Sequence, residues 1–77
     1  MRPFIRVPGF NPRSVTKRFF HEGRLMKFRG FRECRDYEEV EALVRLAERS
    51  GVPIRSLWMR HRGAYLLMVA EGYEGYL

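Results

Sequence analysis

The segment DYEEVEALVRLAERSG, residues 36–51, is the part of this sequence whose secondary structure is most strongly determined. Asp36 is a good N-cap, because its carboxylate accepts hydrogen bonds from the free amides of a first helical turn, and Glu39 completes a capping box. Apolar residues recur at helical spacing through the segment, at Tyr37, Val40, Leu43, Val44 and Ala47. Gly51 supplies the left-handed conformation that ends a helix. The pattern predicts a helix over residues 36–50.

Two runs of strand-forming residues follow this helix, residues 54–61 and 64–70, and they flank Arg62-Gly63. Gly63 can adopt the positive φ that a tight hairpin demands. Two apolar sets alternate along the second run: Tyr65, Leu67 and Val69, and Ala64, Leu66, Met68 and Ala70. Both faces of the predicted hairpin are therefore apolar. Because one helix covers only one face, the N-terminal segment, a second subunit or a partner must cover the other.

Residues 1–23 are less determined. Residues 1–10 are typical of a short extended piece, in which Pro3 and Pro8 restrict any strand to a sheet edge. Beyond them, Asn11 as N-cap, Pro12 at the first position and Gly23 as terminator are compatible with a helix.

A β-hairpin is compatible with the same residues. In that structure residues 14–20 pair with residues 25–31 around a turn at residues 21–24, where Gly23 suits the loop. Adjacent β-branched and aromatic side chains are typical of strands. The run 25–31 needs a partner strand, which favours the hairpin over the helix.

Together these elements predict one α+β domain of 77 residues, with a small antiparallel sheet of four or five strands and one main helix packed on one face. Residues 1–30 form a basic N-terminal segment, with eight cations and one acid for a net charge of +7. Residues 31–77 form the body of helix and hairpin, with seven cations and eight acids for a net charge of −1. This asymmetry indicates two functional regions.

Composition also predicts where the chain works. It has one cysteine, no apolar run near the roughly 20 residues that span a bilayer, and no charged-then-apolar leader. A reduced, cytoplasmic setting without a membrane partner is the expectation.

Residues 34–69 resemble the C-terminal domain of the MecA-type adaptor family, whose members deliver substrates to ClpC-class AAA+ unfoldases. The family's acidic-aromatic motif F-D-D-F-E-D-V has the spacing of CRDYEEV, residues 34–40. Its later segment S-L-Y-K-Y-K-G-K-Y-Y-L is similar to SLWMRHRGAYL, residues 56–66. Cys34 stands where the family usually has an aromatic residue. The resemblance implies a helix packed with a hairpin and a role in protein docking.

Catalytic and metal chemistry has little basis in this sequence. Cys34 is the only thiol and lacks a local nucleophile signature, so a small buried apolar role is expected. One cysteine with His21 and His61 far apart in sequence offers no structural zinc site. The glutamates at the helix start are explained by capping and the helix dipole. We expect no enzyme activity and no cofactor.

The basic segment is the strongest functional signal. Its candidate binding residues are six cations, Arg13, Lys17, Arg18, Arg24, Lys27 and Arg29, interleaved with Phe19 and Phe20. Cations suit phosphates and exposed aromatic rings suit unstacked bases, so the composition fits RNA binding. The same surface also suits a protein with an acidic surface. Alternatively, the phenylalanines are core residues and the arginines are solvated.

The second apolar face of the C-terminal hairpin is the other candidate. Trp58, Leu66 and Met68 are predicted to form an apolar interface, with a partner or in a homodimer, or else to be core beneath the N-terminal segment.

Three functional hypotheses follow. The leading one is a small non-catalytic adaptor, resembling half of a MecA-type protein, that docks an acidic protein partner such as a AAA+ unfoldase through the basic arm and the apolar sheet face. The second is an RNA-binding protein that uses residues 1–30. The third and weakest is a small inhibitor of a larger enzyme.

Overall fold

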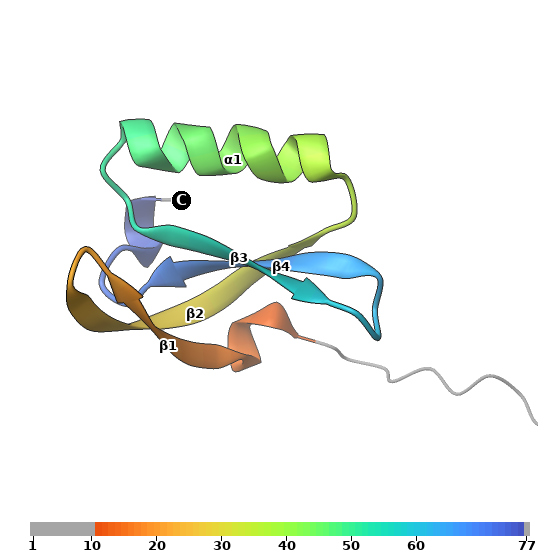
Figure 1. Cartoon of the computed structure of the whole chain (residues 1–77), viewed down its shortest axis with the longest axis horizontal. Helices are drawn as coiled ribbons and strands as arrows, with labels where there is room; N and C mark the ends of the chain where they lie inside the picture. Colours follow the sequence, from red (N-terminus) through yellow and green to blue (C-terminus); the bar gives the residue numbers. More distant parts are fainter. Residues whose placement is uncertain (1–10, 77) are drawn as a thin grey trace, which may run out of the picture.

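The computed structural model describes residues 11–76 and contains one α-helix packed on a four-stranded antiparallel sheet (Figure 1). The elements are η1 (Pro12–Ser14), β1 (Thr16–His21), β2 (Arg24–Cys34), α1 (Tyr37–Arg49), β3 (Ile54–Met59), β4 (Ala64–Ala70) and η2 (Glu74–Tyr76). The strands are ordered β1-β2-β4-β3. The predicted α+β class is confirmed. The short extended piece predicted for residues 1–10 lies outside the described residues.

The helix α1 begins and ends where the sequence predicts. The Asp36 carboxylate accepts from the backbone N–H of Glu38 at 3.0 Å, and Gly51 has φ 74°. The N–H groups of Gly51 and Val52 donate to the carbonyls of Glu48 and Ala47, the paired bonds of a Schellman motif. The sequence predicts that Glu39 completes a capping box. In the structure its carboxylate instead pairs with Arg32 of β2. This contact ties the helix start to the sheet.

The N-terminal hairpin is present and the alternative long helix is not. Asn11 and Pro12 begin only the three-residue η1, and β1 pairs with β2 from Thr16↔Arg29 to His21↔Arg24. Glu22 and Gly23 have φ 54° and 79°, and positive φ at both central residues is the geometry of a type I′ turn. Because β2 extends from Arg24 to Cys34, the boundary predicted at residue 30 falls inside a strand.

The C-terminal hairpin has a longer loop than predicted. β3 ends at Met59, two residues before the predicted end, and residues 60–63 form the loop. The backbone N–H of Arg62 donates to the Met59 carbonyl, and Gly63 has φ 61°. Gly63 therefore supplies the positive φ expected of it, at the last position of a four-residue loop.

Both faces of β4 are buried, and they are covered by different elements. Leu67 and Val69 pack under α1 with Val40 and Ala47. On the face away from α1, called the inner face here, Leu66 and Met68 pack with Phe28 of β2. Further side chains close this inner cluster, at Val15, Phe19, Met26 and Leu57. The N-terminal hairpin therefore provides the second cover that the sequence requires.

The sheet curls until its two edge strands approach each other. Arg55 of β3 donates a hydrogen bond of 3.3 Å to the carbonyl oxygen of Phe20 in β1. Its guanidinium also lies 4.5 Å from the centroid of the Phe19 ring. Figure 1 shows α1 on one side of the sheet and η1, with the start of β1, on the other. None of the helices within residues 11–76 is long and apolar enough to cross a membrane.

Gly30 of β2 lies where η1 packs closely against the sheet. Its backbone N–H donates to the Val15 carbonyl at 2.9 Å, and the register of β2 against β4 shifts between Gly30 and Arg32. A Cβ at this position would overlap the carbonyl oxygen of Pro12 and lie 2.9 Å from Leu66 Cδ1. Only glycine fits between η1 and the inner core.

We therefore predict that Gly30→Ala destabilises the protein by about 1–3 kcal/mol, the usual cost of overpacking a core. Gly75→Ala is the control, because a Cβ there meets nothing within 4 Å. Urea unfolding followed by circular dichroism measures both free energies. Equal stability of the two variants would contradict the close packing at Gly30.

A partly buried ion pair joins β2 to the C-terminal hairpin. Arg62 Nε donates to Glu33 Oε2 at 2.6 Å, and both side chains are about three-quarters covered. This hydrogen bond from Arg62 lowers the pKa of the Glu33 carboxyl below its usual 4.5. The pair therefore contributes stability above about pH 4.5, and that contribution is lost as the pH falls through the lowered value.

We predict that Glu33→Gln lowers the free energy of unfolding at pH 7 and that its difference from wild type shrinks as the pH falls below about 4.5. Glu41→Gln, on the exposed side of α1, controls for the change in net charge. Urea unfolding at several pH values gives the comparison. A constant difference for Glu33→Gln down to pH 3 would be inconsistent with the pair.

Candidate functional site

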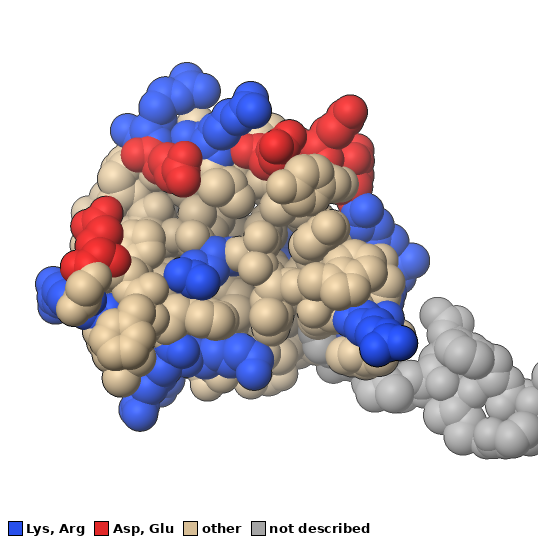
Figure 2. Space-filling view, in the orientation of Figure 1, with Lys and Arg blue, Asp and Glu red and all other residues tan. Residues whose placement is uncertain are grey.

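Five of the six predicted cations are distributed over both faces of the N-terminal hairpin, and the sixth, Arg13, lies in η1. Cross-strand pairing places Arg18 opposite Lys27, and Phe20 opposite Leu25, on the sheet face that also carries α1. We call these four residues the hairpin face. Phe20 is 71% exposed and Leu25 is 57% exposed. Figure 2 shows that the coloured side chains along the lower edge of the molecule, below the sheet, are all basic.

Phe19 does not belong to this surface. It points to the inner face, where its ring makes an edge contact with Phe28 at 5.6 Å between centroids. Adjacent residues of a strand point to opposite faces, so Phe19 and Phe20 cannot act together. Phe19 is therefore half-buried core, which is the alternative that the sequence leaves open for the phenylalanines.

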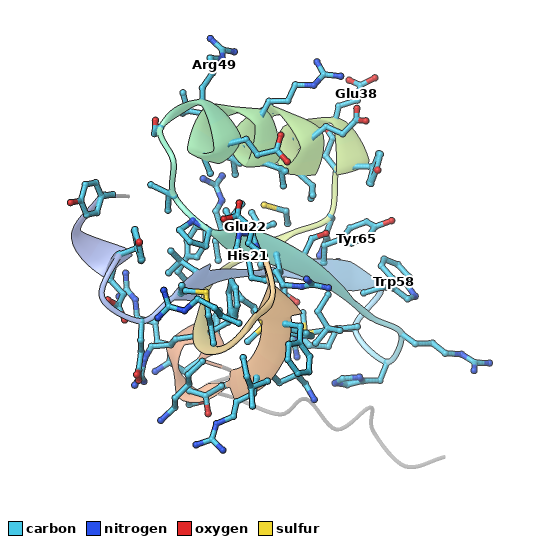
Figure 3. All side chains as sticks on the ribbon, turned by 60° about the vertical axis from the view of Figure 1, so that its left-hand side comes forward. His21, Glu22, Glu38, Arg49, Trp58 and Tyr65 are labelled. Atoms are coloured by element: carbon cyan, nitrogen blue, oxygen red, sulfur yellow. The ribbon has the colours of Figure 1, made fainter. Side chains whose placement is uncertain are left out.

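The predicted apolar interface of Trp58, Leu66 and Met68 is also divided by the sheet. Leu66 and Met68 are fully buried in the inner cluster, so they offer no surface, and their core alternative holds. Trp58 pairs with Tyr65 on the other face and is 52% exposed. Their rings lie side by side with centroids 4.8 Å apart (Figure 3). Trp58 is therefore the only one of the three accessible to a partner.

An open groove of about 890 Å³ lies between α1 and β2. Its apolar floor is formed by Phe31, Leu43, Ala47, Val52, Ile54 and Val69. Arg13, Arg29 and Arg32 also line it, together with Leu46, which is 57% exposed. We call this site the arginine groove. It combines apolar surface with three guanidinium groups.

The arginines of the groove are held in place by local contacts. Arg29 Nη1 donates to the carbonyl oxygen of Arg13 at 3.0 Å, and its guanidinium lies 3.6 Å from the Glu71 carboxylate. Arg32 pairs with Glu39. These ion pairs are half-exposed, and such pairs contribute little to stability. The guanidinium groups therefore remain able to exchange one carboxylate for another.

Among residues 11–76, Glu74 is the one acidic side chain that lines the groove. Its carboxylate accepts from the Gly72 backbone N–H at 2.8 Å, and backbone hydrogen bonds lower its pKa. This carboxylate is occupied in forming the turn before η2. The three arginines are therefore matched by three nearby carboxylates, those of Glu39, Glu71 and Glu74, and an incoming carboxylate competes with them.

Cys34 lies beneath the start of α1 and is 3% exposed. Burial raises the pKa of its thiol, and the nearby charge of Glu39 adds to the shift. A thiolate is therefore scarce at neutral pH, which removes the chemical basis for a nucleophile. Within residues 11–76 there is no cluster of three or more histidine, cysteine, aspartate or glutamate residues that could hold a metal ion.

Sequence patterns did not indicate the arginine groove. It depends on where α1 sits across the sheet, and its residues come from η1, β2, α1, β3, β4 and η2. The one local signal is Leu46, which lies outside the apolar stripe of the predicted helix and is left exposed. Arg13 and Arg29 were identified as binding residues, but without this grouping.

Comparison with family models, curated proteins and solved structures gives no match for this chain.

We predict that the Cys34 thiol of the folded protein reacts far more slowly with a disulfide reagent such as DTNB than it does after denaturation, because it is buried and its pKa is raised. Release of the coloured thiolate at pH 8, with and without guanidinium, measures both rates. Rapid native reaction at a rate typical of free thiols would contradict the buried position.

Proposed function

We propose that this chain is a non-catalytic protein-binding module that docks an acidic, apolar-bearing segment of a partner protein in the arginine groove. The observation that carries this proposal is the juxtaposition of an apolar floor with Arg13, Arg29 and Arg32 in one groove. Apolar side chains of the partner would bury against the floor. Its carboxylates would pair with the guanidinium groups, for which bidentate arginine–carboxylate pairing is well suited.

The size and exposure of the groove support this type of ligand. Its volume of about 890 Å³ is large enough for several side chains of a peptide, and Leu46 presents accessible apolar area at its margin. A full protein interface would need contact beyond the groove. The exposed pair of Trp58 and Tyr65 is an aromatic surface of the type enriched at such interfaces.

The resemblance of residues 34–69 to MecA-type adaptors suggests the identity of the partner. It points to a ClpC-class AAA+ unfoldase, or to a substrate delivered to one. The sequence-based hypothesis used the inner sheet face for docking. Because Leu66 and Met68 are buried there, the arginine groove is the proposed docking surface instead. An inhibitor that occupies an acidic groove of an enzyme would use the same surface.

We predict that a fluorescein-labelled acidic peptide with alternating leucine and glutamate residues binds the chain, and that Leu46→Glu weakens this binding at least about tenfold, or 1.4 kcal/mol. The new carboxylate would remove apolar area and repel the peptide. Fluorescence anisotropy measures the dissociation constant, and the solvent exposure of Leu46 indicates that the variant folds.

Ala42→Glu is the matched control, because Ala42 is an exposed α1 residue that does not line the groove and the change adds the same charge. A peptide of leucine and serine tests the need for carboxylates. Equal effects of Leu46→Glu and Ala42→Glu, or no binding of the acidic peptide at millimolar concentration, would exclude the groove. A pull-down with purified ClpC-class unfoldase then tests the suggested partner.

A further inference from the structure

We propose that the hairpin face, formed by Arg18, Phe20, Leu25 and Lys27, is a binding site for single-stranded nucleic acid, separate from the peptide-docking groove. The first observation is the register of the hairpin. Arg18 and Lys27 are direct cross-strand partners, so two positive charges face the same side of the sheet. Like charges placed opposite each other destabilise a sheet. A polyanion lying over this pair would relieve that repulsion.

The second observation is the next cross-strand pair on the same face of the hairpin. Phe20 is opposite Leu25, and its ring is 71% exposed at the surface. An exposed aromatic ring beside cations is the arrangement on which nucleic-acid bases stack while their phosphates contact lysine and arginine. An acidic peptide would use the cations but stacks a ring on Phe20 only where it carries an aromatic residue, whereas every nucleotide supplies a flat base. Nucleic acid therefore uses both features of the hairpin face.

The spacing of these features also suits a single strand. Neighbouring pairs on one face are two residues apart, or about 6.8 Å along a strand. This distance is comparable to one nucleotide of an extended strand, so a base on Phe20 places its phosphate over Arg18 or Lys27. Lys17 and Arg24 are exposed on the opposite face of the same hairpin, because their cross-strand partners are Phe28 and His21, so they are not part of this site. An exposed face of this kind accepts a single strand without a groove.

Glu71 is the acidic group that faces this site from the neighbouring element. Its carboxylate lies 3.6 Å from Lys27 Nζ and from Arg29 Nη2, and all three side chains are about 40% exposed. An incoming phosphate must compete with this carboxylate for Lys27. We therefore predict that Glu71→Gln binds nucleic acid more tightly than the wild type.

Fluorescence anisotropy with labelled oligo(U) and oligo(dT) 12-mers, across a salt series, tests the proposal. We expect the wild type to bind both oligonucleotides, with log K falling linearly as log salt rises. In Arg18→Ala/Lys27→Ala the slope should be smaller by about 1.4, since each lost single-strand phosphate contact contributes about 0.7. Arg45→Ala/Arg49→Ala is the matched control, because it removes two exposed charges from α1. Its slope should remain that of the wild type.

Phe20 variants test stacking separately from charge. Phe20→Ala should weaken oligonucleotide binding roughly 5- to 150-fold, the usual effect of losing one base–aromatic stack. Phe20→Leu should show the same order of loss, because leucine keeps apolar area but provides no ring. Leu25→Ala, at the paired position, should change binding little. Full binding by Phe20→Leu would overturn stacking and with it the site.

Other outcomes also decide the proposal. Absence of binding to both oligonucleotides at low salt would overturn it. Equal losses of oligonucleotide affinity in Arg18→Ala/Lys27→Ala and in Arg45→Ala/Arg49→Ala would also overturn it. Binding of anionic vesicles but not of oligonucleotides would assign the hairpin face to a membrane surface instead. The acidic-peptide assay on Arg18→Ala/Lys27→Ala separates the two proposals. If this variant keeps peptide binding and loses oligonucleotide binding, the chain has two sites. If it loses peptide binding alone, the hairpin face is a protein contact.

Discussion

The burial of β4 on both faces is the constraint on which this structure depends. Six of its seven residues are buried, and none of them carries a charged side chain. Burying one large apolar side chain stabilises a protein by about 1.5–3 kcal/mol, so neither face can be left to solvent in a chain of this size. The helix α1 covers Leu67 and Val69, and the curled hairpin of β1 and β2 covers Leu66 and Met68. The rest of the chain is arranged around these two covers.

Much of this arrangement is encoded locally, and for that reason it was predictable. The cap at Asp36 and the left-handed Gly51 act within a few residues, so they define α1 without knowledge of the tertiary fold. Gly23 and Gly63 similarly mark the two hairpins through positive φ. The double-faced apolar pattern of residues 64–70 correctly required a second cover. The sequence left open which element would provide it, because that depends on long-range pairing.

The candidate sites were less predictable because they depend on register and on element placement. A shift of one residue in β1 would exchange Phe19 with Phe20, placing the exposed ring in the core. The same alternation separates Trp58 from Leu66 and Met68, because the register of β3 against β4 pairs Trp58 with Tyr65 on the other face. The arginine groove exists only because α1 leaves part of β2 uncovered. No spacing within the chain specifies that offset.

The features that carry both proposals are those that the fold itself does not need. An exposed Leu46, an exposed Phe20 and the opposed cations Arg18 and Lys27 would each be better satisfied by polar or oppositely charged residues. They lie on one continuous surface, because Arg29 lines the groove and follows Lys27 on the same face of β2. Negative charge bound at either site accumulates near Arg29 and Glu71. Two anionic ligands at the proposed sites would therefore oppose each other electrostatically, and the chain would be better suited to exchanging them than to holding both at once.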